Sequence, residues 1–334
     1  MCPKVAIVYN DPAQIHHESV LDVKAVLDVL DEVKVVQQAF EELGYTVILA
    51  PLQPPLHQVR EKLEILDVDL IFNLFEGFEG HPRTEAAVAN IMSEMGLIFT
   101  GCPSKALSLA LDKGKTNALL KKAGVETPDY QILTPRTLSQ FDLSYPCIVK
   151  PPADDASNGI SEDSVVNNQE SLERQLMKIS QRYRGKALVE EYVDGREFNA
   201  LVLCGGEPEV FPISEIVYSL PPGKPEILTY SAKWDPHSIY FKSSQAICPA
   251  QVEDETRERI VDTVRRAFIA VIGSGYGRVD LRLDKDGYPK VMDVNPNPDI
   301  SPDAGVTLQV QTAGLTYTQF IERVAAMAFE RAQR

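Results

Sequence analysis

The sequence predicts an α/β protein built from more than one folding unit, and three observations support this class. The chain has 334 residues, which exceeds one average domain and suggests two or three. Hydrophobic residues make up 44% and charged residues 24%, as in globular rather than disordered chains. Short apolar runs alternate with helical patterns over the first 104 residues, which is typical of a parallel sheet covered by helices.

The first segment predicts buried parallel strands separated by helices. Apolar residues at helical spacing indicate the helices, and Gly44 and Gly96 follow the last apolar positions, as C-terminal caps do. Strands are predicted at 4–9, 46–50, 69–74 and 97–100, and helices at 36–43 and 88–95. We therefore expect an N-terminal α/β domain over residues 1–104.

The rest of the chain predicts two further units, a central one over residues 105–187 and a C-terminal one over 188–334. A helix is expected to begin at Pro103-Ser104 and to end at Lys113. Asp286-Gly287, between two apolar strands, indicates a hairpin. The predicted strands are 146–150, 187–192, 199–204, 209–213, 277–283 and 290–294, and the predicted helices are near 172–179, 254–272 and 316–332.

Charge and cysteine content exclude several classes of protein. Lys and Arg total 33 and Asp and Glu total 48, a net charge of −15, which disfavours nucleic acid and anionic membranes as partners. No run of about 18 apolar residues predicts a membrane helix, and the N-terminus shows no secretory signal. The five cysteines are scattered and form no CxxC pair, which indicates reduced thiols in a cytoplasmic protein.

Three oxygen-bearing residues of the predicted hairpin suggest a metal site. Asp293 and Asn295 face the same side of one strand, and the neighbouring strand brings Asp280 within reach. Such oxygen ligands suit Mg²⁺, which also keeps positions for water and phosphate. Polar side chains beside a turn would give the same pattern, but carboxylates within apolar strands are costly unless they are paired or bound to metal.

Several cations could contact phosphate. Lys150 ends an apolar strand and opens into the turn-rich segment 151–159, which is where open α/β sheets place ligands and where backbone N–H groups can approach phosphate. Lys113, Lys233 and Arg278 are weaker candidates, since a single cation is more often a solvated surface residue. The chain has no GxxxxGK[ST] or GxGxxG motif.

Two glutamates, Glu190 and Glu197, flank the predicted turn Asp194-Gly195. Carboxylates at a hinge could accept hydrogen bonds from an adenine amine and from ribose hydroxyls. A salt-bridged or exposed pair is the alternative interpretation.

In this order the motifs resemble the ATP-grasp superfamily, in its D-alanine–D-alanine ligase-like branch, over essentially the whole chain. Each motif is weak, but the ordered set is specific. The motifs are Thr100-Gly101, Leu111-Asp112-Lys113, Ile148-Val149-Lys150-Pro151, Val189-Glu190-Glu191-Tyr192, Gly195-Arg196-Glu197, Ala232-Lys233, Gly277-Arg278-Val279-Asp280 and Asp293-Val294-Asn295-Pro296. The resemblance implies an ATP-grasp fold, with α+β architecture in its ATP-binding part.

The resemblance also implies roles for particular residues. Phosphate contacts would come from Lys113, Lys150, Lys233 and Ser157 of the loop, and nucleoside contacts from Glu190, Glu191, Val193 and Glu197. Asp280, Asp293 and Asn295 would hold two Mg²⁺, or Mn²⁺ in their place, and Arg278 would stabilise an oxyanion while Lys233 assists catalysis. Residues 218–240 would form a lid, and the family is commonly homodimeric.

The substrate end departs from the D-alanine ligases. The usual residues are replaced by Glu76, Ala156, Trp234, Asp299 and Ala304, Ser301 lies beside them, and Glu18 is a candidate for the N-terminal substrate-orienting glutamate. We therefore expect an ATP- and Mg²⁺-dependent carboxylate–amine ligase whose small-molecule substrates are not two D-alanines. An authentic D-alanine–D-alanine ligase and a non-catalytic ATP-binding protein are the alternatives.

Overall fold

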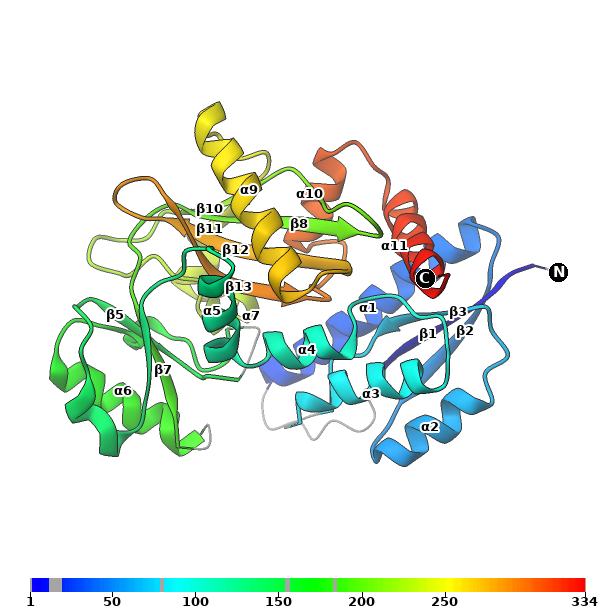
Figure 1. Cartoon of the computed structure of the whole chain (residues 1–334), viewed down its shortest axis with the longest axis horizontal. Coiled ribbons are helices and arrows are strands. Elements are labelled where there is room, and N and C mark those ends of the chain that lie inside the picture. The colour runs from blue at the N-terminus through cyan, green and yellow to red at the C-terminus, as the bar shows by residue number, and fades with distance from the viewer. Residues whose placement is uncertain (1, 12–19, 79–80, 154–156, 183–184, 334) are drawn as a thin grey trace.

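The computed structural model describes residues 2–11, 20–78, 81–153, 157–182 and 185–333. Its strands form three separate sheets, one parallel and two antiparallel (Figure 1). Each sheet is built from consecutive segments of the chain, while the division into domains at residues 104 and 187 stays a prediction. Among the described residues no helix is both long and apolar enough to cross a membrane.

The N-terminal sheet is parallel, as the apolar runs predicted, with the order β2-β1-β3. The predicted fourth strand at 97–100 is wrong: Phe99 makes a single parallel bridge to Ile71, and the chain turns away at Gly101 with φ +89°. The elements of this part are β1 Lys4–Asn10, α1 Val20–Glu42, β2 Thr46–Leu52, α2 Leu56–Glu64, β3 Leu70–Leu74 and α3 Arg83–Glu94.

The central part holds an antiparallel sheet in the order β4-β7-β5-β6, packed on α6 around a core of its own. The single helix predicted to end at Lys113 is instead two helices. The Asp112 side chain accepts a hydrogen bond from the Lys115 N–H, so Lys113 begins the second helix. The elements are α4 Ser104–Ala110, α5 Lys113–Lys122, β4 Tyr130–Leu133, β5 Cys147–Lys150, β6 Val165–Val166, α6 Gln169–Arg182 and β7 Ala187–Glu191.

The C-terminal part contains the largest sheet, in the order β11-β10-β8-β12-β13, with β9 on β8. The segment 218–240, which the resemblance implied to be a lid, contains a short helix, α7, which Thr229 caps through its side chain. The elements are β8 Glu197–Cys204, β9 Glu209–Val210, β10 Ser214–Tyr218, α7 Tyr230–Trp234, α8 Ile239–Lys242, β11 Ser244–Ile247, α9 Asp254–Val271, β12 Gly275–Leu283, β13 Pro289–Pro296, α10 Gly305–Thr312 and α11 Tyr317–Ala332.

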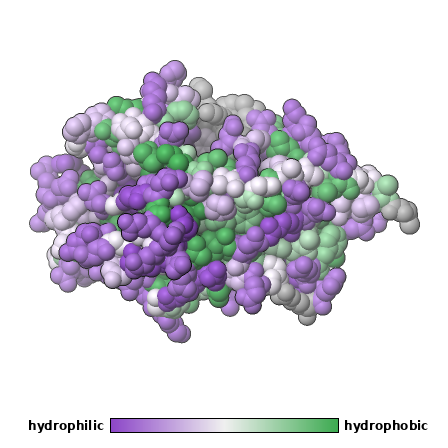
Figure 2. All heavy atoms as spheres, turned by 90° about the horizontal axis from the view of Figure 1, so that it is seen from above, coloured by the Kyte–Doolittle hydropathy of each residue, from purple (hydrophilic) through white to green (hydrophobic). Residues whose placement is uncertain are grey.

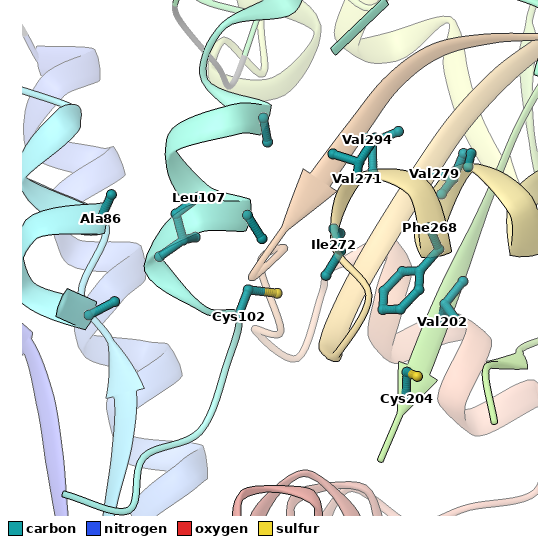
Figure 3. Packing of buried hydrophobic residues seen from close by; sticks show 14 of the residues in the cluster. Ala86, Cys102, Leu107, Val202, Cys204, Phe268, Val271, Ile272, Val279 and Val294 are labelled. Carbon is teal, nitrogen blue, oxygen red and sulfur yellow. The ribbon is translucent and has the colours of Figure 1, made fainter. Parts of the chain in front are cut away.

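Two apolar cores join the large sheet to the N-terminal part. In the first, side chains from α3 and α4 meet those of α9, β8, β12 and β13, and Figure 3 shows Cys102 beside Ile272. In the second, α11 packs against α1 and the parallel sheet. Cys204 lies in the first of these cores and Cys147 in the core of the central part, and no two of the five cysteines form a disulfide. The face seen in Figure 2 is mostly hydrophilic, with hydrophobic residues gathered near its middle.

Candidate active site

The β12–β13 hairpin brings the three predicted metal-ligating residues together. The strands are antiparallel, with Asp280 directly opposite Asp293 and Arg278 directly opposite Asn295. Alternate residues of a strand face the same side of a sheet. The four side chains therefore share one face, as the predicted hairpin required.

A β-bulge at Met292 makes this arrangement compatible with the core. Asp280 pairs with Asp293, but Leu281 pairs with Val291, so Met292 has no partner on β12. Val291 and Val294 are both buried although they are three residues apart, which regular alternation would not allow. The extra residue lets both valines face the core while Asp293 faces the site.

The two carboxylates already have cationic partners. Arg278 donates to Asp280 through Nε at 2.7 Å and through a terminal nitrogen at 2.8 Å, and the Asn295 amide donates to Asp280 Oδ2 at 2.9 Å. Lys113 Nζ lies 2.6 Å from Asp293 Oδ2. Burial alone would raise the pKa of Asp293, but the Lys113 ammonium lowers it below its ordinary value.

All three predicted phosphate-binding lysines lie near this hairpin, each from a different element. Lys113 begins α5, Lys150 ends β5, and Lys233 lies in α7. The charge of Lys150 also contributes to lowering the pKa of Asp293. Burial, followed by the nearby Arg278 charge, lowers the pKa of Lys233, while Asp280 and Asp293 act against this shift. The site therefore combines clustered positive charge with two carboxylates.

The predicted nucleoside-binding glutamates all have polar partners, as the salt-bridge alternative anticipated. The Glu190 side chain is 1% exposed, accepts from the Asn117 amide at 2.9 Å through Oε1, and lies 2.7 Å from Lys150 Nζ through Oε2. That second contact lacks the alignment of a directed hydrogen bond. Lys290 Nζ lies 2.7 Å from Glu191. The Lys150–Glu190 ion pair therefore brings a predicted phosphate ligand and a predicted nucleoside ligand into direct contact.

Glu197 contacts two residues that sequence reasoning missed, Arg282 and Tyr218. Asn117, which contacts Glu190, was missed as well. A signal existed for two of the three, since Arg282 continues the polar alternation Arg278-x-Asp280-x-Arg282 and Asn117 lies one helical turn after Lys113. Nothing in the sequence pairs Tyr218 with Glu197.

The predicted substrate-pocket residues lie on two parts of the structure. Glu76, Asp299 and Ser301 lie in loops, and Trp234 lies in α7. Glu76 and Asp299 both lie within electrostatic range of Glu32, because the charge of each raises the pKa of that carboxyl group. Asp299 also accepts from the Ser301 N–H at 2.8 Å. Trp234 contacts the Tyr230 ring within α7, and α7 contacts α1, the helix that carries Glu32. Ala304 precedes α10, and Ser157 adopts a positive φ of 61°, whereas Ala156 and Glu18 lie outside the described residues.

Glu32 is a third acidic group at this end of the site, and no sequence pattern singled it out. It is 6% exposed and accepts a hydrogen bond from the Ile300 N–H at 3.1 Å. Burial, followed by the charges of Glu76 and Asp299, raises its pKa well above the ordinary value. Three neighbouring carboxyl groups therefore make this end of the site acidic.

We expect Glu32→Gln to stabilise the protein at neutral and alkaline pH. A carboxyl group whose pKa is raised by folding binds its proton more tightly in the native state, so the free energy of unfolding falls as pH rises through that pKa. The variant lacks this loss, so the difference in melting temperature should be near zero at pH 4 and reach a few degrees above neutral pH. Thermal unfolding of both proteins across pH measures it. A difference that shrinks as pH rises would contradict the assignment.

Comparison with known proteins agrees with this architecture. The family model described as "D-ala D-ala ligase C-terminus" matches residues 119–326. A D-alanine–D-alanine ligase of Bacillus anthracis, solved as a complex with ATP, superimposes with a TM-score of 0.76 at 20% identity, covering 100% of this chain and 99% of that one. The VanG D-Ala:D-Ser ligase of Enterococcus faecalis gives a TM-score of 0.74 at 18% identity, covering 98% and 100%.

Curated relatives extend the comparison to the sequence. An uncharacterized protein of Sinorhizobium fredii, y4sG, is 34% identical over 263 residues, or 78% of this chain and 75% of its own length. The D-alanine–D-alanine ligase of Haemophilus influenzae is 26% identical over 302 residues, or 88% and 94%.

The fold is thus that of an ATP-grasp protein. The family match covers more than half of the chain, and the chain therefore belongs to the D-alanine–D-alanine ligase-like family. The predicted fold class is confirmed.

Proposed function

We propose that this protein is an ATP- and Mg²⁺-dependent carboxylate–amine ligase that forms an amide through an acyl phosphate. The observation that carries the proposal is the convergence of Lys113, Lys150 and Lys233, from three separate elements, on the paired carboxylates of β12 and β13. Mere structural stabilisation does not require so many cations at one hairpin, whereas a transferring phosphoryl group does.

The residues present fit a hard divalent cation. Asp280, Asp293 and Asn295 offer oxygen atoms on one sheet face, and the Asn295 amide nitrogen is the atom that donates to Asp280, which leaves its oxygen as the ligand. Among the described residues no group of three His, Cys, Asp or Glu side chains is arranged to hold a metal ion, so the Asn295 amide would complete the set. Bound there, one or two Mg²⁺, or Mn²⁺, would neutralise phosphate charge.

The remaining residues would orient the nucleotide and the reacting groups. The lysines would hold phosphate oxygens, joined by Ser157 of the loop. Glu190 and Glu197, with the backbone of Glu191 and Val193, would hold the nucleoside. A carboxylate is a poor electrophile, so transfer of the ATP γ-phosphoryl group to it precedes attack by the amine, with phosphate as the leaving group. Arg278 would stabilise the oxyanion formed in that attack.

The acidic end of the site supports a substrate with a cationic amine rather than two D-alanines. Glu32, Glu76 and Asp299 together favour positive charge in a partly desolvated place. Similarity to curated D-alanine–D-alanine ligases supports the alternative, that the protein is itself such a ligase. We also propose that the protein forms a homodimer, as the family resemblance implies.

ADP release against a panel of amino acids and amines tests the substrate. We expect diamines and basic amino acids, each supplied with a carboxylate partner, to give turnover that exceeds D-alanine alone by about tenfold or more, roughly the worth of one charged contact. Equal or better turnover with D-alanine alone would refute the substrate assignment and support the alternative. Binding of Mg·ATP without turnover of any substrate would favour a non-catalytic ATP-binding protein.

A further inference from the structure

One face of the large sheet carries a second polar cluster beside the carboxylate pair. Glu197, at the start of β8, lies directly opposite Arg282 on β12 and opposite Ile216 on β10. Tyr218 is two residues beyond Ile216 and therefore faces the same side as Glu197. Arg282 is two residues beyond Asp280, about 7 Å along the strand. The cluster is thus continuous with the proposed metal end of the site.

The two oxygens of Glu197 differ in their partners. Oε2 accepts three hydrogen bonds, from Arg282 Nε at 3.1 Å, from an Arg282 terminal nitrogen at 2.5 Å and from the Tyr218 hydroxyl at 2.8 Å. Oε1 has no hydrogen bond to any described residue. A carboxylate held through one oxygen by three donors is fixed in orientation and presents the other oxygen as an acceptor.

Arg282 has the character of a rigid support. It is 4% exposed, its other N–H groups donate to the carbonyl oxygens of Val193 and Glu226, and its guanidinium lies over the Tyr192 and Tyr218 rings at cation–π range. Burial alone would lower the pKa of Arg282, but Glu197 raises it above the ordinary value. The guanidinium therefore stays charged, and it also ties Glu197 to Val193, a residue of the proposed adenine-binding hinge.

We propose that Arg282 and Tyr218 are positioning residues that orient Glu197, so that its Oε1 accepts a ribose hydroxyl and the site discriminates ribonucleotides from deoxyribonucleotides. This inference rests on the proposed function, because it requires a nucleotide at this face. Arg282 and Tyr218 would then confer the sugar selectivity without contacting the nucleotide themselves. An acceptor with fixed direction rejects a sugar lacking the hydroxyl, because the oxygen is then left unpaired.

Calorimetric titration with Mg·ATP, Mg·2′-deoxy-ATP and Mg·3′-deoxy-ATP tests the inference without turnover. We expect the wild-type protein to bind ATP at least about tenfold more tightly than one of the two deoxy-nucleotides, the worth of one hydrogen bond to a charged group. Tyr218→Phe should reduce this preference severalfold, and Arg282→Met should bring it close to one. If the Arg282 variant does not fold, the Tyr218 variant alone decides.

Arg196→Met is the matched control. Arg196 precedes Glu197 and forms a two-point ion pair with Glu215 on the opposite face of the same strands, at 2.6 and 2.7 Å. Loss of this pair should leave the sugar preference unchanged. The inference would be overturned if the wild-type protein bound ATP and both deoxy-nucleotides equally tightly. It would also be overturned if the tested variants kept the preference for ATP, or if the Arg196 control lost it to the same extent. Failure of the wild-type protein to bind ATP at all would instead overturn the proposed function.

Discussion

Asp280→Asn is expected to lower ATP-dependent turnover by about 10³-fold or more, while the variant still unfolds cooperatively. Asp280 lies opposite Asp293 and holds Arg278 at two points and Asn295 at one. The substitution removes a charge that both a divalent cation and Arg278 require, but it preserves the volume and some of the hydrogen-bonding capacity. Steady-state ADP release and urea denaturation measure the two halves of the prediction.

Asp286→Asn serves as the control for this variant. Asp286 lies exposed in the turn of the same hairpin, outside the site, so the same chemical change there should leave turnover within about twofold, a surface effect. If Asp280→Asn kept activity comparable to this control, the metal assignment of the hairpin would be removed.

Lys150→Met is expected to destabilise the protein by about 3 kcal/mol. The Lys150 and Glu190 side chains are 12% and 1% exposed, and the substitution leaves the Glu190 carboxylate buried with the Asn117 amide as its one remaining polar partner among the described residues. Removing one member of a buried ion pair costs far more than the pair itself contributes. Urea denaturation monitored by circular dichroism gives the change in the free energy of unfolding.

Two further variants test that cause. Lys150→Met combined with Glu190→Gln removes the buried charge, so it should recover a large part of the lost stability. Lys121→Met breaks the Lys121–Asp129 pair, whose side chains are 42% and 73% exposed, and should cost less than about 1 kcal/mol. A Lys150 variant no less stable than the Lys121 variant would show that Glu190 does not depend on Lys150.

The sequence predicted the fold wherever a pattern was local. Apolar runs located β1, β2 and β3, and the Asp286-Gly287 turn located the β12–β13 hairpin. The prediction failed where tertiary contacts decide the structure. The segment around Phe99 is as apolar as a strand, but it bridges β3 at one point only. The side-chain cap at Asp112 divides into two helices what looked like one.

The site was predictable to the extent that its residues alternate along strands. The grouping of Asp280, Asp293 and Asn295 follows from hairpin register, whereas the role of Arg278 came from the family resemblance. Glu32 could not be predicted, because it lies in a helix with several other acids, and its burial and its hydrogen bond from Ile300 depend on tertiary contacts of α1. Tyr218 likewise becomes a neighbour of Glu197 only through β10–β8 pairing.

The unpaired Met292 limits how the length of this hairpin can vary. Val291 and Val294 both need the core, while Asp293 must oppose Asp280. A strand one residue shorter at this point would turn either a valine toward water or the carboxylate toward the interior. Single-residue deletions are therefore far less acceptable here than at the exposed Asp286-Gly287 turn, and chain length at Met292, as much as residue identity, is under structural constraint.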